Sequence, residues 1–231
     1  MIIYGKQVCL HALEKHETKI EKIYLTKLSV LPKDLLKKYG SKIKTIENKW
    51  AQKLAKGGNH QGIIVELDDI EAPDISSVKK SDFILILDGL TDVGNIGAII
   101  RTAYALGVEA VVASGVRQLN YEAIARTSSG ASLDLVPIVL QNPLDLINEL
   151  KQLDFKLYGA DLDGEPLGSA TFETKRVLIL GSEDKGISKR VKSKLDSVYK
   201  IEMAREFDSL NVSAAAAIFI YRMSNGVKWV I

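Results

Sequence analysis

Cysteine is almost absent from this chain, since Cys9 is the only one among 231 residues. A single thiol excludes an intrachain disulfide and a cluster of cysteines around a metal ion. Histidine is also scarce, because only His11, His16 and His60 occur and all three lie in the first 60 residues of the chain. With so few of the side chains that bind transition metals, the sequence predicts no metal centre.

Long apolar runs are absent as well. No stretch reaches the roughly 18 consecutive apolar residues that suggest a transmembrane helix. The first residues, Met1–Lys6, have neither the charge order nor the long apolar core of a secretory signal peptide. We therefore expect a cytoplasmic protein in a reducing compartment, without a membrane partner.

Arginine is missing from the first 70 residues, which hold 13 lysines and 8 acidic residues for a net charge of +5. The remaining residues hold 18 lysines and arginines against 21 acidic residues, a net charge of −3. A lysine-rich segment can bind nucleic-acid phosphates without sequence preference. Lysines also keep small domains in solution, so charge alone leaves both interpretations open.

Residues 1–70 alternate between short apolar runs and helical patterns, which predicts a small αβ domain. We expect its strands at 2–4, 20–26, 43–46 and 63–65, and its helices at 6–14, 31–40 and 48–55. Residues 71–81 are rich in acidic residues and serine and carry no apolar period, so we expect a linker there.

Residues 82–231 predict an α/β domain with a mostly parallel sheet. The domain opens on Phe83–Leu87, a continuous apolar run typical of a strand buried on both faces. A helix expected at 96–106 and a strand at 108–113 complete a right-handed βαβ unit. We expect further strands at 136–140, 156–160, 177–180 and 199–203, and further helices at 121–127, 144–153, 188–197 and from 214 onward.

Polar loops follow two of the expected strands. Gly181–Gly186 follows the strand at 177–180, and Ser209–Ser213 comes after the strand at 199–203. Open α/β sheets bind their ligands at the carboxyl ends of their strands. Ala214–Ala217 then begins a helix with side chains so small that another backbone can pack closely against it, although ordinary core packing explains this run equally well.

The familiar nucleotide and hydrolase patterns are missing from these loops. Their glycine spacing fits neither the dinucleotide fingerprint nor the phosphate loop of nucleotide hydrolases, and residues 82–231 contain no histidine for a Ser-His-Asp triad. The remaining polar side chains suit orientation and charge stabilisation, which is what group transfer from an activated cofactor needs. They are Arg101, Asn95, Glu183, Ser209 and Asn211.

Arg101 and Asn95 belong to the first helix of this second domain. Arg101 points away from the apolar face of that helix, one turn beyond Gly97, which has no side chain to cover the backbone. Asn95 stands near the helix start, where asparagine is a good cap. An exposed arginine with an asparagine cap is the simpler explanation of this pair taken alone.

Three blocks resemble the RNA 2′-O-methyltransferases of the SPOUT superfamily, SpoU/TrmH branch. The first is Asn95–Ala103, the second is Leu180–Ile187, and the third joins Ile201–Met203 to Ser209–Ser213. Their order and spacing make the resemblance specific, and it covers residues 83–223. Two departures lie in or near the third block, where Glu202 replaces a usual proline and Arg205 stands where glycine is common.

This resemblance implies a fold and a cofactor that no periodicity would have predicted. It implies a deep trefoil knot at the carboxyl end, a homodimer, and S-adenosylmethionine bound by the knotted loops. The cofactor-binding residues that it implies are Gly181, Ser182, Glu183, Ile201, Met203 and Leu210. It also assigns the activating role to Arg101, although a guanidinium holds its proton strongly and can instead grip a phosphate or steady an alkoxide.

The first domain carries a resemblance of its own. Ile3–Gly5 and His60–Ile63 are similar to the L30e-like substrate domain of the enzymes that methylate a guanosine of 23S rRNA in the peptidyl-transferase P loop. The RNA-binding residues expected there are Tyr4, Lys6, His60 and Gln61. A tRNA ribose 2′-O-methyltransferase of the same branch and a non-catalytic, knotted RNA-binding protein remain the alternatives.

Overall fold

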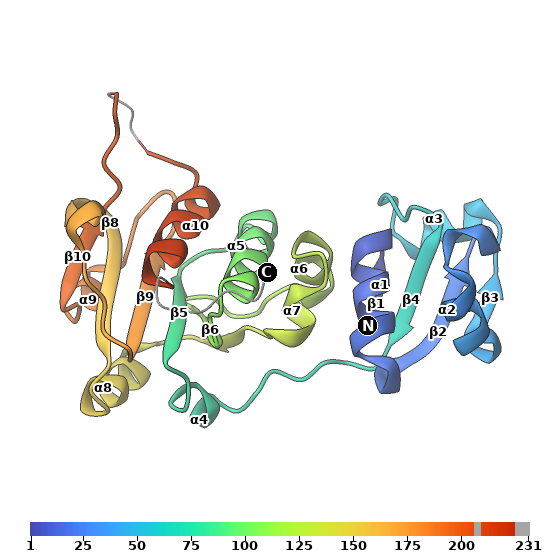
Figure 1. Ribbon diagram of the computed structural model, residues 1–231, viewed down its shortest axis with the longest axis horizontal. Coiled ribbons are helices and arrows are strands. Elements are labelled where there is room, and N and C mark those ends of the chain that lie inside the picture. The colour runs from blue at the N-terminus through green and yellow to red at the C-terminus, as the bar shows by residue number, and fades with distance from the viewer. Residues whose placement is uncertain (206–208, 225–231) are drawn as a thin grey trace. The chain divides into compact units, whose positions relative to one another are not determined.

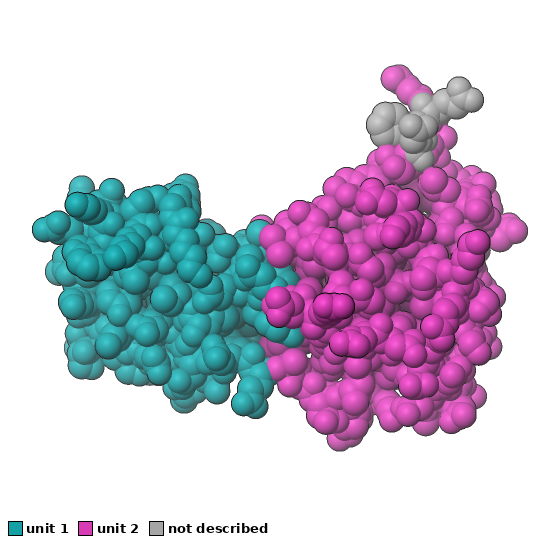
Figure 2. Space-filling model, turned by 180° about the vertical axis from the view of Figure 1, so that it is seen from behind, with its two compact units in different colours: residues 1–71, 120–134 teal, residues 72–119, 135–231 magenta. Residues whose placement is uncertain are grey.

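The computed structural model describes residues 1–205 and 209–224 of the chain (Figure 1), so the end of the expected second domain, 225–231, lies outside the described residues. The chain divides into two compact units. The first contains residues 1–71 and 120–134, and the second contains 72–119 and 135–231, coloured separately in Figure 2. Within the described part, the structure has no helix with the length and apolar character that a membrane span requires.

The first unit is built on a four-stranded sheet in the order β1-β4-β2-β3. β4 pairs antiparallel with β1 and β2, whereas β2 and β3 are parallel. The strands are β1 (Ile2–Tyr4), β2 (Ile20–Leu25), β3 (Ile43–Thr45) and β4 (Ile63–Leu67), and the helices between them are α1 (Lys6–Lys15), α2 (Lys33–Lys38) and α3 (Asn48–Leu54). The order of elements predicted for residues 1–70 is confirmed.

The core of this unit lies between α1 and the sheet. The buried face of α1 carries Val8, Cys9, Ala12 and Leu13, which pack with Ile3 and other apolar residues of the sheet. Burial raises the pKa of the Cys9 thiol far above its ordinary value, although a backbone hydrogen bond opposes the shift. The thiolate is therefore inaccessible near neutral pH, and Cys9 acts as a small apolar core residue.

A segment from the middle of the sequence completes this core. It consists of α6 (Tyr121–Thr127) and α7 (Ala131–Asp134), whose Ala125 and Leu133 belong to the same apolar cluster as Ile3. The sequence-based boundaries place this segment in the second domain. Its apolar positions do not reveal which of two cores they enter, and the contacts of the folded chain group them with the first.

The second unit is organised by a six-stranded sheet in the order β10-β8-β9-β5-β6-β7, in which every strand pair is parallel. Its strands are β5 (Phe83–Asp88), β6 (Ala110–Ser114), β7 (Ile138–Leu140), β8 (Lys156–Pro166), β9 (Arg176–Gly181) and β10 (Ser197–Lys200). All six residues of β5 are buried, as its uninterrupted apolar run predicted. The α/β class with a mostly parallel sheet is confirmed.

The helices of this unit differ from the expected ones at several points. They are α4 (Ile75–Val78), α5 (Val93–Ala105), α8 (Leu144–Gln152), α9 (Lys189–Lys192) and α10 (Val212–Met223). The basic helix expected at 188–197 is therefore only four residues long. Asp196 ends this stretch, because its amide donates to the carbonyl of Leu157 and its carboxylate accepts from the amide of the same residue.

Two further expectations are corrected. Residues 71–81 are not a plain linker, because Asp74 caps α4 and the buried Val78 joins the core of the second unit. The strand expected at 156–160 is longer than predicted, because β8 continues through Asp161–Gly164 to Pro166 beside β10. A glycine is needed at position 164, since a Cβ there would lie 2.5 Å from the backbone carbonyl carbon of Tyr199. The trefoil knot remains a prediction.

Candidate active site

The carboxyl ends of three neighbouring strands meet at one edge of the second sheet. Asp88, the last residue of β5, stands opposite Gly181 of β9 and Ser114 of β6. The buried carboxylate of Asp88 accepts hydrogen bonds from the Ser114 hydroxyl at 2.9 Å and from the Ser188 amide at 2.9 Å. Asp88 thus anchors the loop that follows β9, a role that sequence reasoning missed because aspartate after a strand is common in loops.

Gly181 is the point where this loop turns back on itself. The amide of Gly186 donates to the carbonyl of Ser182 at 2.9 Å, and the two residues form an isolated antiparallel bridge. A Cβ at position 181 would lie 2.0 Å from the carbonyl carbon of Gly186. No side chain can be accommodated there without moving the backbone, so the loop that carries Ser182 and Glu183 has its shape because residue 181 is glycine.

Three of the expected catalytic side chains are joined by hydrogen bonds. Asn95 Nδ2 donates to Glu183 Oε1 at 2.9 Å. Asn211 Nδ2 lies 3.1 Å from the same oxygen and 3.1 Å from Asn95 Oδ1. These residues are far apart in the sequence, so the fold has brought together one carboxylate and two amides at the strand ends.

The caps of two helices explain why these amides are available. Asp92, not Asn95, caps α5, because its carboxylate accepts from the Asn95 amide at 2.7 Å. The helix therefore starts earlier than predicted, and the Asn95 side chain lies in the first turn, where it reaches Glu183. Asn211 caps α10 with its oxygen, which accepts from the Ser213 amide at 2.9 Å, and so keeps its nitrogen for Glu183.

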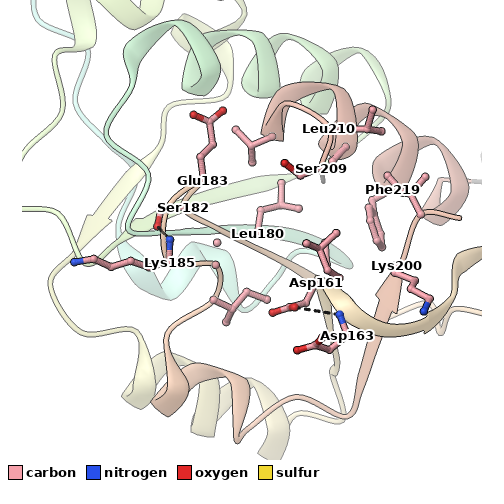
Figure 3. Close-up of a pocket in the computed structure, with 18 of the residues that line it drawn as sticks. Asp161, Asp163, Leu180, Ser182, Glu183, Lys185, Lys200, Ser209, Leu210 and Phe219 are labelled. Atoms are coloured by element: carbon pink, nitrogen blue, oxygen red, sulfur yellow. Dashed lines mark hydrogen bonds between the residues drawn. The ribbon is translucent and has the colours of Figure 1, made fainter. Parts of the chain in front are cut away.

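A cavity of about 800 Å³ opens beside this network (Figure 3). That volume lies within the usual range for small-molecule sites. Six of the residues lining the cavity are those expected to bind the cofactor, namely Gly181, Ser182, Glu183, Ile201, Met203 and Leu210. Ser209 and Asn211 line it as well. The local sequence patterns therefore predicted much of this cavity wall.

Arg101 is placed differently. It lies on α5 with its side chain exposed, and it is not among the described residues that line the cavity. Asn95 precedes it on the same helix, so α5 connects the hydrogen-bonded network to the arginine. An exposed guanidinium outside the cavity is suited to a substrate that approaches from solvent rather than to the small molecule within.

An ion pair that sequence reasoning missed lies across the cavity wall from the network. Lys192 Nζ donates to Asp161 Oδ2 at 2.9 Å, and Asp163 Oδ2 lies 3.7 Å from the same ammonium. Burial acts to raise the pKa of Asp161, but the hydrogen bonds from Lys192 and the backbone outweigh it and lower that pKa. The hydrogen bond to Asp161 raises the pKa of Lys192 in turn.

Replacing Asp161 by asparagine should reveal this pair as an acid-sensitive contact. The pKa of Asp161 is lower in the folded chain than its ordinary 3.8, so its contribution to stability is present above that value and is lost as pH falls further. At neutral pH we expect Asp161→Asn to lower the melting temperature by roughly 2–4 °C, the shift that ~1 kcal/mol causes in a chain of this size. Thermal scans should show the difference shrinking below pH ~4; an equal difference at every pH would contradict the assignment.

The residues expected to bind RNA gather at the start of α1 and the loop before β4. The Lys6 amide donates to Gln61 Oε1 at 2.7 Å, and the Tyr4 ring lies so close to Gly58 that a Cβ there would stand 2.2 Å from its hydroxyl. His60 is buried, and its Nδ1 accepts from the Gly62 amide at 3.0 Å. His60 therefore supports the loop from inside, whereas contact between RNA and Tyr4, Lys6 and Gln61 stays a prediction.

Comparison with known families assigns the two parts of the chain. Residues 82–221 match the SpoU rRNA Methylase family, and residues 2–73 match the RNA 2′-O ribose methyltransferase substrate binding family. The chain belongs to the SpoU rRNA methylase family. It is accordingly an RNA 2′-O-methyltransferase, and the resemblance seen in the three sequence blocks is confirmed.

Named relatives cover much or nearly all of the chain. The 23S rRNA (guanosine-2′-O-)-methyltransferase RlmB of Photorhabdus laumondii is 28% identical over 95% of this chain and 96% of its own. RlmB of Bordetella pertussis is 31% identical over 73% of this chain and 71% of its own. An uncharacterized tRNA/rRNA methyltransferase of Archaeoglobus fulgidus is 39% identical over 64% of this chain and 68% of its own.

Solved structures show the same fold. The SpoU methyltransferase AviRb of Streptomyces viridochromogenes, solved with AdoMet, has a TM-score of 0.78 at 23% identity over 97% of this chain and 89% of its own. An AdoMet-bound rRNA methyltransferase of Sinorhizobium meliloti has a TM-score of 0.80 at 18% identity over 99% of this chain and 88% of its own. Both units of this chain therefore have counterparts in that fold.

Proposed function

We propose that the chain methylates the ribose 2′-hydroxyl of a guanosine in the peptidyl-transferase P loop of 23S rRNA, with S-adenosylmethionine as the donor. The observation that carries the proposal is the network of Asn95, Glu183 and Asn211 beside a cavity of small-molecule size. The similarity to RlmB proteins along nearly the whole chain supports 23S rRNA as the substrate. Two tRNA-modifying neighbours, each with a TM-score of 0.55, cover 65% and 62% of this chain.

The cavity suits S-adenosylmethionine in size and charge. The backbone around Gly181 approaches so closely that no side chain intrudes there, and the acidic Glu183 and Asp161 lining the cavity suit a cationic donor. Lys185, Lys189 and Lys200 also line the cavity and can pair with the carboxylate of an amino acid. Gly181, Ile201 and Leu210 hold the cofactor through their backbones, and Ser182, Glu183 and Met203 complete its surroundings.

The chain's own residues then have separate tasks. S-adenosylmethionine supplies a methyl group that is already activated for transfer. Asn95, Glu183 and Asn211 hold one another in place, and with Ser209 they orient the ribose so that its 2′-oxygen faces the cavity. Arg101 grips the adjacent phosphate and stabilises the negative charge that grows on the 2′-oxygen as its proton leaves to solvent.

Mapping of ribose methylation in total RNA tests this function. RNA from cells lacking the protein is incubated with the purified chain and S-adenosylmethionine, and 2′-O-methyl sites are read by resistance to alkaline cleavage. We expect one new site at a guanosine of the 23S P loop. New methylation on tRNA instead would support the alternative substrate of the same family, and no new site in either RNA would contradict both substrates.

The surface formed by Tyr4, Lys6 and Gln61, where the start of α1 meets the loop before β4, is proposed to contact the RNA backbone. Replacing the exposed Lys6 by glutamine should weaken RNA binding and reduce the slope of log affinity against log salt by about one, since one phosphate contact is lost. Lys33→Gln on α2 removes an equal charge elsewhere in the same unit and serves as the control. An equal loss of RNA affinity in both variants would mean that the net charge of the unit, and not this surface, governs RNA binding.

A homodimer is proposed as the working form, supported by an exposed apolar surface on the second unit. Tyr104 of α5 and Ile218 and Tyr221 of α10 are 37%, 38% and 55% exposed. The two helices pack against each other, so these side chains can form one continuous surface for a second copy of the chain. A mass of twice 25.4 kDa by light scattering is the expected result.

A further inference from the structure

Three side chains of the first unit hold their polar atoms within 4.8 Å of one another: His11 on α1, His16 directly after it, and Asp134 at the end of α7. His11 Nε2 lies 2.8 Å from Asp134 Oδ2, and His16 Nε2 lies 3.0 Å from Asp134 Oδ1. The carboxylate therefore sits between two imidazole rings. The three side chains are 18%, 17% and 22% exposed, so each keeps a solvent-facing part through which a small ion can reach the group.

The ring nitrogen of His16 is the least satisfied atom of this group. Nε2 is buried and, within the described residues, makes no hydrogen bond of acceptable geometry, although Asp134 is only 3.0 Å away. A buried polar nitrogen without a hydrogen bond carries a cost in stability, because it has lost its hydrogen bond to water. A metal ion seated between this nitrogen and the carboxylate would remove that cost, because the nitrogen lone pair would coordinate the ion.

The backbone that brings Asp134 to the histidines is shaped around the His11 ring. Gly130, in the turn between α6 and α7, has a φ of +98°, and a Cβ there would lie 2.7 Å from the Cγ of His11. Both the conformation and the close approach require glycine. The chain thus places α7 against α1 closely enough for an aspartate 123 residues away to meet His11.

We propose that His11, His16 and Asp134 bind one divalent transition-metal ion, with zinc as the best match. Two imidazole nitrogens and one carboxylate are a ligand set that zinc accepts, and a water completes four-coordination. Calcium and magnesium prefer sites made wholly of oxygen ligands. The ion ties α7 to the amino-terminal helix, so its role is to stabilise the first unit rather than to take part in methyl transfer.

The ammonium of Lys15 competes with a metal ion for the Asp134 carboxylate. The ammonium lies 3.6 Å from Asp134 Oδ2, and the Lys15 side chain is 48% exposed. In the metal-free chain this charge offsets the carboxylate, and its long, flexible stem lets it move away when a metal ion arrives. Removing the ammonium without removing a ligand should therefore strengthen metal binding.

Metal titration of the untagged, full-length chain tests the proposal. The chain is stripped with a chelator and titrated with Zn²⁺ against a chromophoric chelator, and we expect one ion bound per chain. His16→Gln and Asp134→Asn should each weaken binding by about tenfold or more, because each removes one of three protein ligands. Lys15→Gln should tighten binding several-fold, whereas Asp34→Asn, which removes an exposed carboxylate on α2, should change nothing.

Cobalt provides a readout that needs no substitution. Co²⁺ added to the stripped chain should give the intense visible absorption of a four-coordinate site, and Zn²⁺ should abolish it. Circular dichroism checks that each variant is folded. The proposal is overturned by binding of less than one ion per chain, by unchanged affinity in folded His16→Gln and Asp134→Asn chains, or by a cobalt spectrum typical of the hydrated ion.

Discussion

Gly181→Ala is expected to weaken cofactor binding severely. The added Cβ would stand 2.0 Å from the Gly186 carbonyl carbon and 2.2 Å from the Ile187 nitrogen, both backbone atoms that cannot swing aside. Relief requires opening the turn that places Ser182 and Glu183 at the cavity. Overpacking typically costs 1–3 kcal/mol, so affinity for S-adenosylmethionine should fall on the order of 100-fold, as measured by titration calorimetry.

A second glycine provides the matched control for this substitution. Gly40 has no neighbouring atom within 4 Å of an added Cβ. Gly40→Ala should therefore bind the cofactor like the unsubstituted chain. If Gly181→Ala retained full affinity, the loop after β9 would not be the cofactor site, and the methyltransferase would bind S-adenosylmethionine elsewhere.

Arg101→Ala should reduce methyl transfer by roughly 10²–10⁴-fold while cofactor affinity stays within a few-fold of normal. The reason is the placement of Arg101 on α5 outside the cavity, where it can meet the RNA but not the cofactor. Single-turnover kinetics with a 23S fragment and calorimetry with the cofactor measure the two quantities separately. Equal losses in both would show that Arg101 supports the fold of α5 rather than the reaction.

One further variant distinguishes the two roles of this arginine, and a second variant serves as the control. Arg101→Lys keeps the positive charge but loses the planar guanidinium. Substantial activity in that variant would favour charge stabilisation, whereas a loss as deep as in Arg101→Ala would favour two-point binding of a phosphate. Arg190→Ala, which removes an exposed arginine on α9, should leave transfer unchanged and controls for general loss of RNA attraction.

The site was predictable where its residues stand in local patterns. The polar loops after 177–180 and 199–203 were expected at a ligand-binding edge, and the six expected cofactor residues do line one cavity. Asp161 and Lys192 were not found, because Asp161 lies beyond the strand expected at 156–160 and Lys192 is one of several lysines in the helix expected at 188–197. Only the extension of β8 beside β10 brings that carboxylate and that ammonium together.

Hydrogen-bond geometry also decided which helix cap is real. Asparagine and aspartate are both good caps, so Asp92 and Asn95 could not be separated from their types alone. In the structure Asp92 caps α5 by accepting from the backbone amide of Asn95. The side-chain amide of Asn95 is then available to donate to Glu183. The residue type also left the role of His60 undecided. Histidine suits RNA contact, but the His60 ring is buried against its own loop.

The amino-acid sequence by itself determined the two αβ parts, the strand order along the chain, the family and part of the cavity wall. These follow from apolar period, from glycine and polar residues after strands, and from short blocks of fixed spacing, all of which are local. Only the tertiary structure decided that residues 120–134 join the first core, that Asn95, Glu183 and Asn211 share hydrogen bonds, and that Asp134 meets His11 and His16. Such contacts join residues distant in sequence, and no local pattern specifies which distant partner each side chain meets.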